Sequence, residues 1–382
     1  MLNLCSIINL KKKKMKKFNF IKAVLISSVV IFSSCGTDND VVECSVSSPD
    51  NYVFSHDGTN TVSFGGQTAR LKMVGEILDK LEDETATDVA LLNEMFANGT
   101  GFADATLDAS GKQVRSKTAG YQTATVKANV QAMFDSWLVD YTSNVAPAMA
   151  AGTQAAPGVP GWVDNRELNA KGQELDQFFA KGLIGALCLD QVANGYLSEA
   201  KIGDGVDNVT RDPYTDMEHH WDEGYGYIYG IQGAEGITSE EISGDNLLGK
   251  YLTKYEDHRA TVYNAFIEGR QAIVENCSEV RDEQAQIIKE TLSKVVAIRA
   301  AYYLEDAALQ TDLSAAYFHS LSEGYGFIMS LQFTVDANGN PYYTHDEVNI
   351  MLDQLNAGNG FWDRTDAELN QMAADIKAVC GL

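Results

Sequence analysis

Residues 219–228 read HHWDEGYGYI, and residues 319–328 read HSLSEGYGFI. Both stretches fit the pattern H-x-x-x-E-G-Y-G-[YF]-I, and their first histidines are 100 positions apart. Because a histidine and a glutamate four positions apart lie on one face of a helix, each copy predicts a helix that presents the same polar pair. The repetition indicates an internal duplication in which each half directs its pair at a ligand, at a metal or at the other pair.

Apolar residues recur at helical spacing through most of the remaining chain. This periodicity predicts helices at about residues 68–83, 124–142, 167–198, 256–277, 279–310 and 313–331. Three Thr-x-x-Glu pairs have the spacing of a capping box, which closes the start of a helix. These pairs are Thr215 with Glu218, Thr344 with Glu347, and Thr365 with Glu368. Only six prolines occur in 382 residues, which favours long helices over a many-turned β sandwich, so the chain is expected to be all-α.

The duplication extends beyond the motif, because residues 186–193 align with residues 301–308. In this alignment Asp190 corresponds to Glu305, and both acids lie on an apolar helix face. An unpaired buried carboxylate is costly, so such an acid has either a buried partner or a boundary position from which it reaches water. Both interpretations stay open for both acids.

The N-terminus has the pattern of a bacterial export signal. A basic start at Met15, which we take as the true start, precedes ten mostly apolar residues that are too few to span a bilayer. The stretch ends in Ser-Ser-Cys, which resembles a lipobox, so residues 1–35 are predicted to be a lipoprotein signal with Cys35 lipidated. The alternative is an ordinary secreted cysteine behind a signal-peptidase site.

An acid-rich segment follows the signal. Residues 36–52 are expected to form a flexible tether. Their acids are compatible with a surface-export signal or with a plain periplasmic spacer. The body is therefore expected at the outer membrane, held by its lipid, on the periplasmic or the surface face.

Acidic residues dominate the rest of the chain. Seven of the 29 Lys and Arg residues lie within residues 1–35, which leaves 22 against 53 Asp and Glu. The resulting net negative charge repels nucleic acid, so no nucleic-acid partner is expected. Cys188 lies in an apolar run and is expected to be buried. A bridge between Cys277 and Cys380 is compatible with an oxidising compartment, although spacing alone fixes no pairing.

The first motif resembles the signature of imelysin-like lipoproteins. That signature is G-x-H-x-x-E, followed by an aromatic and aliphatic run that ends in W-G. His220, Glu223 and Gly230 match it, whereas Glu218 stands in place of the leading glycine.

A longer resemblance covers about residues 50–380. The form HHWDEGYG, together with YVF at residues 52–54 and GGQTARL at residues 65–71, resembles the domain-of-unknown-function family 4856, lipoproteins related to imelysins. The resemblance implies two α-helical bundles related by a pseudo-repeat, with the motif in a groove between them. We expect these halves at residues 53–232 and 233–382, packed as one unit. The resemblance also implies iron uptake, with a TonB-dependent receptor or an imelysin-like lipoprotein as partner.

The repeated pairs and the two aligned acids define the candidate site. The candidate metal or ligand-binding residues are His219, His220, Glu223, His319, Glu323, Asp190 and Glu305. If the motif helices cross, the two His–Glu pairs could form one metal site, as bundle sites use Glu and His from facing helices. The aligned acids would add oxygen ligands or orient the histidines. Such a mixed set suits a divalent metal such as iron, manganese or zinc.

A structural interpretation competes with metal binding. Glycine inside a helix costs about 1 kcal/mol relative to alanine, so the motif glycines indicate a ridge of small residues for close helix packing. These glycines are Gly224, Gly226, Gly230, Gly324 and Gly326. In this interpretation the His–Glu pairs are buried, hydrogen-bonded locks between helices.

We therefore expect a non-enzymatic binding or accessory protein, and the family resemblance implies that it works in metal or haem acquisition. A metal-dependent hydrolase with a His–Glu site and a purely structural surface protein are the alternatives. No G-x-S-x-G, H-E-x-x-H, P-loop or Rossmann pattern occurs, so no catalytic residue is assigned.

Overall fold

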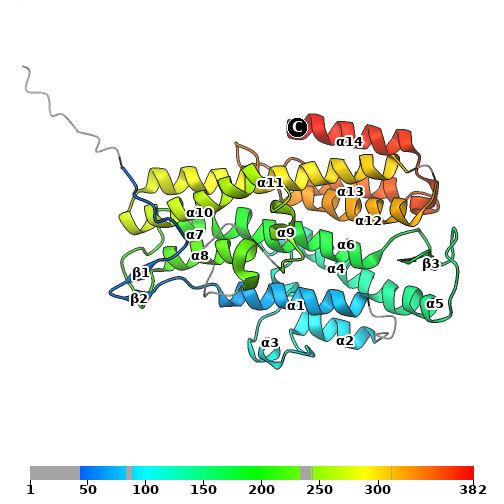
Figure 1. Cartoon of the computed structure of the whole chain (residues 1–382), viewed down its shortest axis with the longest axis horizontal. Helices are drawn as coiled ribbons and strands as arrows, with labels where there is room; N and C mark the ends of the chain where they lie inside the picture. The colour runs from blue at the N-terminus through cyan, green and yellow to red at the C-terminus, as the bar shows by residue number, and fades with distance from the viewer. Residues whose placement is uncertain (1–43, 83–87, 233–241, 243, 311) are drawn as a thin grey trace, which may run out of the picture. The chain divides into compact units, whose positions relative to one another are not determined.

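Both motif helices are buried among other helices (Figure 1). The computed structural model describes residues 44–382 apart from 83–87, 233–241, 243 and 311. The predicted signal with Cys35, and the tether up to residue 43, lie outside the described residues. Cys44–Leu382 forms one unit, and its regular structure is almost wholly helical, which confirms the all-α prediction.

The helices differ widely in length. The longer α-helices are α1 (Gly65–Leu81), α4 (Ala124–Asp140), α6 (Leu175–Leu183), α8 (Asp216–Tyr229), α10 (Glu256–Glu275), α11 (Ser278–Ala308), α12 (Ala315–Ser330), α13 (His345–Asn356) and α14 (Asp366–Cys380). The short ones are α2 (Val89–Asn93), α3 (Ala105–Ala109), α5 (Ala146–Ala150), α7 (Glu199–Ile202) and α9 (Leu248–Leu252). π-Helical segments are η1 (Glu94–Asn98), η3 (Tyr141–Val145) and η4 (Ile184–Tyr196). Turns of 3-10 helix are η2 (Arg115–Lys117), η5 (Gly230–Gln232), η6 (Leu331–Phe333) and η7 (Gly360–Asp363).

Within the described residues, four short strands form two antiparallel hairpins. They are β1 (Ser55–His56) with β2 (Thr59–Asn60), and β3 (Gly161–Val163) with β4 (Arg166–Leu168). Asp57 and Gly58 turn the first hairpin with positive φ angles of 48° and 78°, as tight two-residue turns require. The second hairpin lies directly before α6 and borders the site described below.

All three predicted capping boxes are formed. The side chain of Thr215 accepts a hydrogen bond from the backbone N–H of Glu218, and the Glu218 side chain accepts one from the Thr215 N–H. The same reciprocal bonds begin α13 and α14. These local bonds fix where the helices begin, because they satisfy backbone donors that have no partner inside the helix.

The helix predicted at residues 167–198 is wrong over its first part. Residues 167–168 belong to β4, and α6 begins only at Leu175. Gly172 has a φ of 75°, which is a left-handed turn and not a helical position, and a Cβ there would lie 2.7 Å from the ring of Phe318. Close contact with α12 therefore overrides the apolar periodicity at this point.

The long helix α11 organises the packing. It packs along α10, α12 and α14, while α12 also packs on α6, and α8 packs on η4, α1 and α10 (Figure 1). The boundary predicted between the halves falls at residues 233–241, outside the described residues, so the two-bundle pseudo-repeat stays a prediction. In the described part of the chain, we find no helix with both the length and the apolar character needed to cross a bilayer.

A disulfide links two distant parts of the chain. Cys277, at the start of α11, is bonded to Cys44 and not to Cys380, with a Cα–Cα distance of 5.8 Å. Cys188 and Cys380 are buried free thiols, so the burial predicted for Cys188 is confirmed. The bridge between Cys277 and Cys380, which the sequence left open, is not formed, because Cys277 pairs with Cys44.

Candidate functional site

The two His–Glu pairs have nearly the same local geometry. In α8, His219 Nε2 lies 4.0 Å from Glu223 Oε2. In α12, His319 Nε2 lies 3.9 Å from Glu323 Oε2. Each pair therefore shares one helix face, as the four-residue spacing predicted.

Neutral hydrogen-bond donors hold the first carboxylate. Gln67 Nε2 of α1 donates to Glu223 Oε1 over 2.9 Å, and Tyr196 OH of η4 donates to the same oxygen over 3.2 Å. The ring of His219 stacks on Tyr214 with centroids 4.6 Å apart. The first pair thus ties α8 to α1 and η4.

Charged groups surround the second pair. Lys181 Nζ of α6 lies 3.2 Å from Glu323 Oε1, and Tyr251 OH of α9 donates to that oxygen over 2.9 Å. Burial opposes ionisation of Glu323, but the ammonium of Lys181 and the hydroxyl donors outweigh it and lower the pKa of the carboxyl. His319 Nδ1 lies 2.9 Å from Glu174 Oε2, at the start of α6.

Two motif glycines allow neighbouring helices to approach closely. A Cβ at Gly226 would lie 2.5 Å from Phe64 Cβ at the start of α1. A Cβ at Gly326 would overlap Lys181 Cβ and the backbone of Gly182 in α6. The helix that packs against each of these glycines also carries a donor to the motif glutamate. In α1 this donor is Gln67, and in α6 it is Lys181. Close packing therefore explains these two glycines.

The other three motif glycines are less tightly constrained. A Cβ would lie 3.5 Å from Leu197 at Gly224, 3.3 Å from Thr68 at Gly230 and 3.2 Å from Tyr303 at Gly324. The steric need for glycine is thus concentrated three positions after each motif glutamate.

The two pairs do not converge on one metal site among the described residues. In the described residues, each glutamate is held by its own set of donors. No group of three or more His, Cys, Asp or Glu side chains among those residues is arranged to hold a metal ion. The reason is that α8 packs mainly on η4 and α1, whereas α12 packs mainly on α6 and α11.

His220 and Asp190 have partners elsewhere. His220 Nδ1 lies 2.8 Å from Lys201 O, and burial lowers the pKa of the imidazole. Asp190 is fully buried and accepts hydrogen bonds from Tyr121 N over 3.0 Å and Gln122 Nε2 over 2.7 Å. Asp190 therefore holds the segment before α4 against η4.

The alignment of Asp190 with Glu305 hides two different roles. Glu305 is partly exposed and pairs with Lys377, so it joins α11 to α14. Asp190 is the acid with buried partners, and Glu305 is the acid at the boundary. The described partners of Asp190 and Glu305 are not the motif histidines but Tyr121, Gln122 and Lys377.

A buried cluster of charged side chains that the sequence did not predict joins Glu218 and Asp222 of α8 to Arg270. Arg270 of α10 is fully buried, with Nη1 3.0 Å from Glu218 Oε1 and Nε 2.9 Å from Asp222 Oδ1. Tyr52 OH also donates to Asp222 Oδ1 over 2.7 Å. The one sequence feature that indicated this cluster was Asp222, an acidic residue among the aromatic residues of the motif. This Arg270 cluster joins α8, α10 and the segment before β1.

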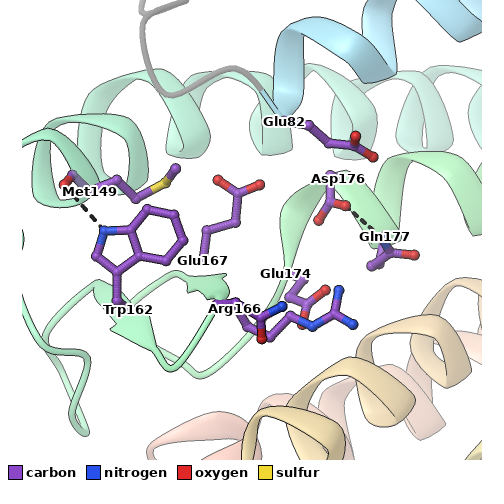
Figure 2. Close-up of a pocket in the computed structure, with 9 residues that line it drawn as sticks. Glu82, Met149, Trp162, Arg166, Glu167, Glu174, Asp176 and Gln177 are labelled. Carbon is purple, nitrogen blue, oxygen red and sulfur yellow. Dashed lines mark hydrogen bonds and ion pairs between the residues drawn. The ribbon is translucent and has the colours of Figure 1, made fainter.

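Two polar cavities border α6, and the second pair lines one of them. One, of about 320 Å³, lies among α1, α6, α9 and α12, and Lys181 and Glu323 line it. The other, of about 280 Å³, lies between the β3–β4 hairpin and α6, and Trp162 lines it (Figure 2). Asp176 and Gln177 border both cavities, so the two adjoin. We call these two cavities together the α6 cleft.

Asp176 is a buried carboxyl group at the junction of the α6 cleft. Its Oδ2 accepts a hydrogen bond from Gln177 Nε2 over 2.5 Å, while Oδ1 is buried and has no hydrogen-bond partner among the described residues. Burial, and then the repulsion of Glu174, raise the pKa of Asp176 to about 7. The sequence analysis missed this residue, because no motif marks it within the run LDQFFAKGL.

The sequence matches a known protein family over a region that includes both motifs and the α6 cleft. The family described as Domain of unknown function (DUF4856) matches residues 49–382. The chain belongs to the DUF4856 family. No curated protein and no solved structure matches it. The matched region of this DUF4856 protein contains both motif helices and the α6 cleft.

Proposed function

We propose that this DUF4856 protein is a lipid-anchored, non-enzymatic binding protein of the bacterial outer membrane, with the α6 cleft as its ligand site. The observation that carries the proposal is the buried Asp176 carboxyl, which has one unpaired oxygen at the junction of two polar cavities. Convergent polar groups and shifted pKa values in a cavity favour a binding site. The second motif supports this choice, because His319 and Glu323 border the cleft.

The proposed location has two supports. The lipobox-like sequence that ends at Cys35 supports lipid anchoring. The disulfide between Cys44 and Cys277 supports export, because disulfides persist in oxidising compartments. We place the folded body on the periplasmic or the surface face of the outer membrane.

The setting that we propose is metal or haem acquisition, beside a TonB-dependent receptor or an imelysin-like lipoprotein. This setting rests on the family resemblance. Protein metal sites use three or four ligands, and no group of three or more His, Cys, Asp or Glu side chains among the described residues is arranged to hold a metal ion. The side chains of the cleft therefore favour a ligand that is bound through charge and hydrogen bonds over a bare metal ion. The same observation disfavours the metal-dependent hydrolase.

A growth experiment with matched variants tests this proposal. A deletion strain would be complemented with the double variant His319→Gln, Glu323→Gln, or with the matched control His219→Gln, Glu223→Gln, and grown on limiting iron or haem. We expect the first variant to fail and the control to restore growth, while thermal unfolding shows that both are folded. Full growth with the first variant, or normal growth of the deletion strain itself, would contradict the proposal and favour a structural surface protein.

A further inference from the structure

Carboxyl groups outnumber cationic groups in the α6 cleft. Six Asp and Glu side chains line it, against three Lys and Arg side chains and one histidine. Two of the basic groups already have carboxylate partners: Lys181 pairs with Glu323, and Arg166 Nε lies 3.7 Å from Glu174 Oε1. The cleft therefore retains an excess of acids, which favours a cationic ligand.

Asp176 is the acid best placed to bind such a cation. Only 5% of the residue is exposed, and Oδ1 has no hydrogen-bond partner among the described residues. A buried polar atom without a partner is costly, so a donor that enters the cleft gains a hydrogen bond at no loss of an internal one. Asp176 borders both cavities, so a ligand in either of them reaches it.

The wall of the cleft favours an organic cation over an inorganic one. Trp162 lines the same cavity, and its Nε1 donates to Met149 O over 3.2 Å, which holds the ring in place. In Figure 2, Trp162 lies on one side of the cavity and Asp176 on the other. Ammonium groups and apolar surfaces both gain from an indole face. A bare metal ion would find no group of three ligands among the described residues.

We propose that the α6 cleft binds a small organic ammonium ion, with its charged nitrogen at Asp176 and its apolar part against Trp162. The inference rests on the proposed binding function and specifies its ligand class. Below pH 7 the Asp176 carboxyl is mostly neutral, so it releases its proton to water when the ammonium group binds and becomes the carboxylate partner. No covalent bond of the ligand changes.

Proton release makes the affinity depend on pH. Because burial and Glu174 raise the pKa of Asp176 to about 7, the apparent affinity should rise about tenfold between pH 6 and pH 8. The other charged or titratable groups that line the cleft are Asp79 on α1, Glu82 after α1, Arg166 and Glu167 on β4, Glu174 before α6, Lys181 on α6, Lys250 on α9, and His319 and Glu323 on α12. His319→Gln serves as the control for the pH profile, because it removes the imidazole that lines the cleft and leaves Asp176 in place.

Titration calorimetry on the purified protein tests the proposal. The probes are benzylamine and 1,4-diaminobutane, with benzyl alcohol as the neutral counterpart of the first. We expect an amine to bind with release of a proton, benzyl alcohol to bind at least tenfold more weakly, and Asp176→Asn to lose at least tenfold in affinity. Asp353→Asn, an exposed acid on α13, should bind as the parent does.

Three outcomes would overturn the inference: neither amine binds, benzyl alcohol binds as tightly as benzylamine, or Asp176→Asn keeps the affinity. The growth experiment separates this failure from failure of the proposed function. If the amines fail and the His319, Glu323 variant still does not restore growth, the ligand class is wrong and the binding function stands. If that variant restores growth, the proposed function itself is wrong.

Discussion

The surroundings of the two His–Glu pairs agree in packing and differ in charge. The helix that packs against Gly226 of α8 is α1, and it supplies the neutral amide of Gln67. The helix that packs against Gly326 of α12 is α6, and it supplies the ammonium group of Lys181. Nδ1 of His219 is buried without a hydrogen-bond partner among the described residues, but Nδ1 of His319 faces Glu174. The ionic groups of the first region are matched deep inside, around Arg270, and those of the second region border cavities.

The repeated motif therefore determines how the helices pack more than it determines a shared chemistry. The glycine three positions after the glutamate has the same steric role in both regions. The chemistry follows from the neighbouring helix, which the motif does not encode. Changes that remove charge should therefore act differently in the two regions.

The largest effect should come from the Arg270 cluster. Replacing Arg270 with Ala leaves Glu218 and Asp222 as buried charges without their main partner, so the free energy of unfolding should fall by about 3–5 kcal/mol. Urea denaturation measures the loss. Arg115→Ala is the control, because the Arg115 pair with Asp135 is about one-third exposed and should cost about 1 kcal/mol or less. Equal losses for the two arginine variants would show that burial of the first cluster is unimportant.

The second largest effect concerns pH. The folded-state pKa of Asp176, about 7, lies above its ordinary value of 3.8, so this group favours the folded state most below pH 4 and loses that contribution as the pH rises through 7. Between pH 5 and pH 8 the loss should be about 2–3 kcal/mol. In Asp176→Asn, urea denaturation at the two pH values should show a correspondingly smaller difference, and an unchanged difference would contradict the burial of this carboxyl.

A glycine substitution should separate packing from helix propensity. Gly326→Ala inserts a methyl group against Lys181 and the α6 backbone and should destabilise the protein by about 1–3 kcal/mol. Gly224→Ala meets only ordinary contacts and should be neutral or stabilise by up to about 1 kcal/mol. Thermal unfolding of both variants gives the comparison, and a destabilisation that is the same at both positions would remove the steric explanation.

The smallest effect should come from the histidines. His319→Ala removes the contact with Glu174 and, because the side chain is partly exposed, should cost about 1 kcal/mol. His219→Ala removes a ring stack with Tyr214 and should change the free energy of unfolding by roughly 0.5 kcal/mol. Denaturation at one pH measures both, and a larger loss at His219 would reverse the comparison between the regions.

The sequence predicted the features that nearby residues determine. Thr215 and Glu218 are three positions apart, so the capping box could be read directly, and the four-residue spacing placed each His–Glu pair on one face. The same periodicity failed at residues 167–174, where Gly172 turns the chain against a helix that is distant in sequence.

The composition of the cleft could not be predicted in this way. His319 and Glu174 are 145 positions apart, and only the packing of α12 on α6 brings them together. Asp176 looks like any acid in the first turn of a helix until the cavities beside it are known. A helix face fixes which side chains point together, but it does not determine what lies opposite.

The disulfide has a mechanical consequence. Cys44 is the first described residue, and its covalent bond joins it to the first turn of α11, 233 positions later. A pulling force applied to the chain ahead of Cys44 would enter the folded body at this junction and bypass the β1–β2 hairpin. If the proposed lipid anchor pulled on the chain, the tension would therefore reach the beginning of α11 first, and unfolding from the amino-terminal end would require reduction of the Cys44–Cys277 bond.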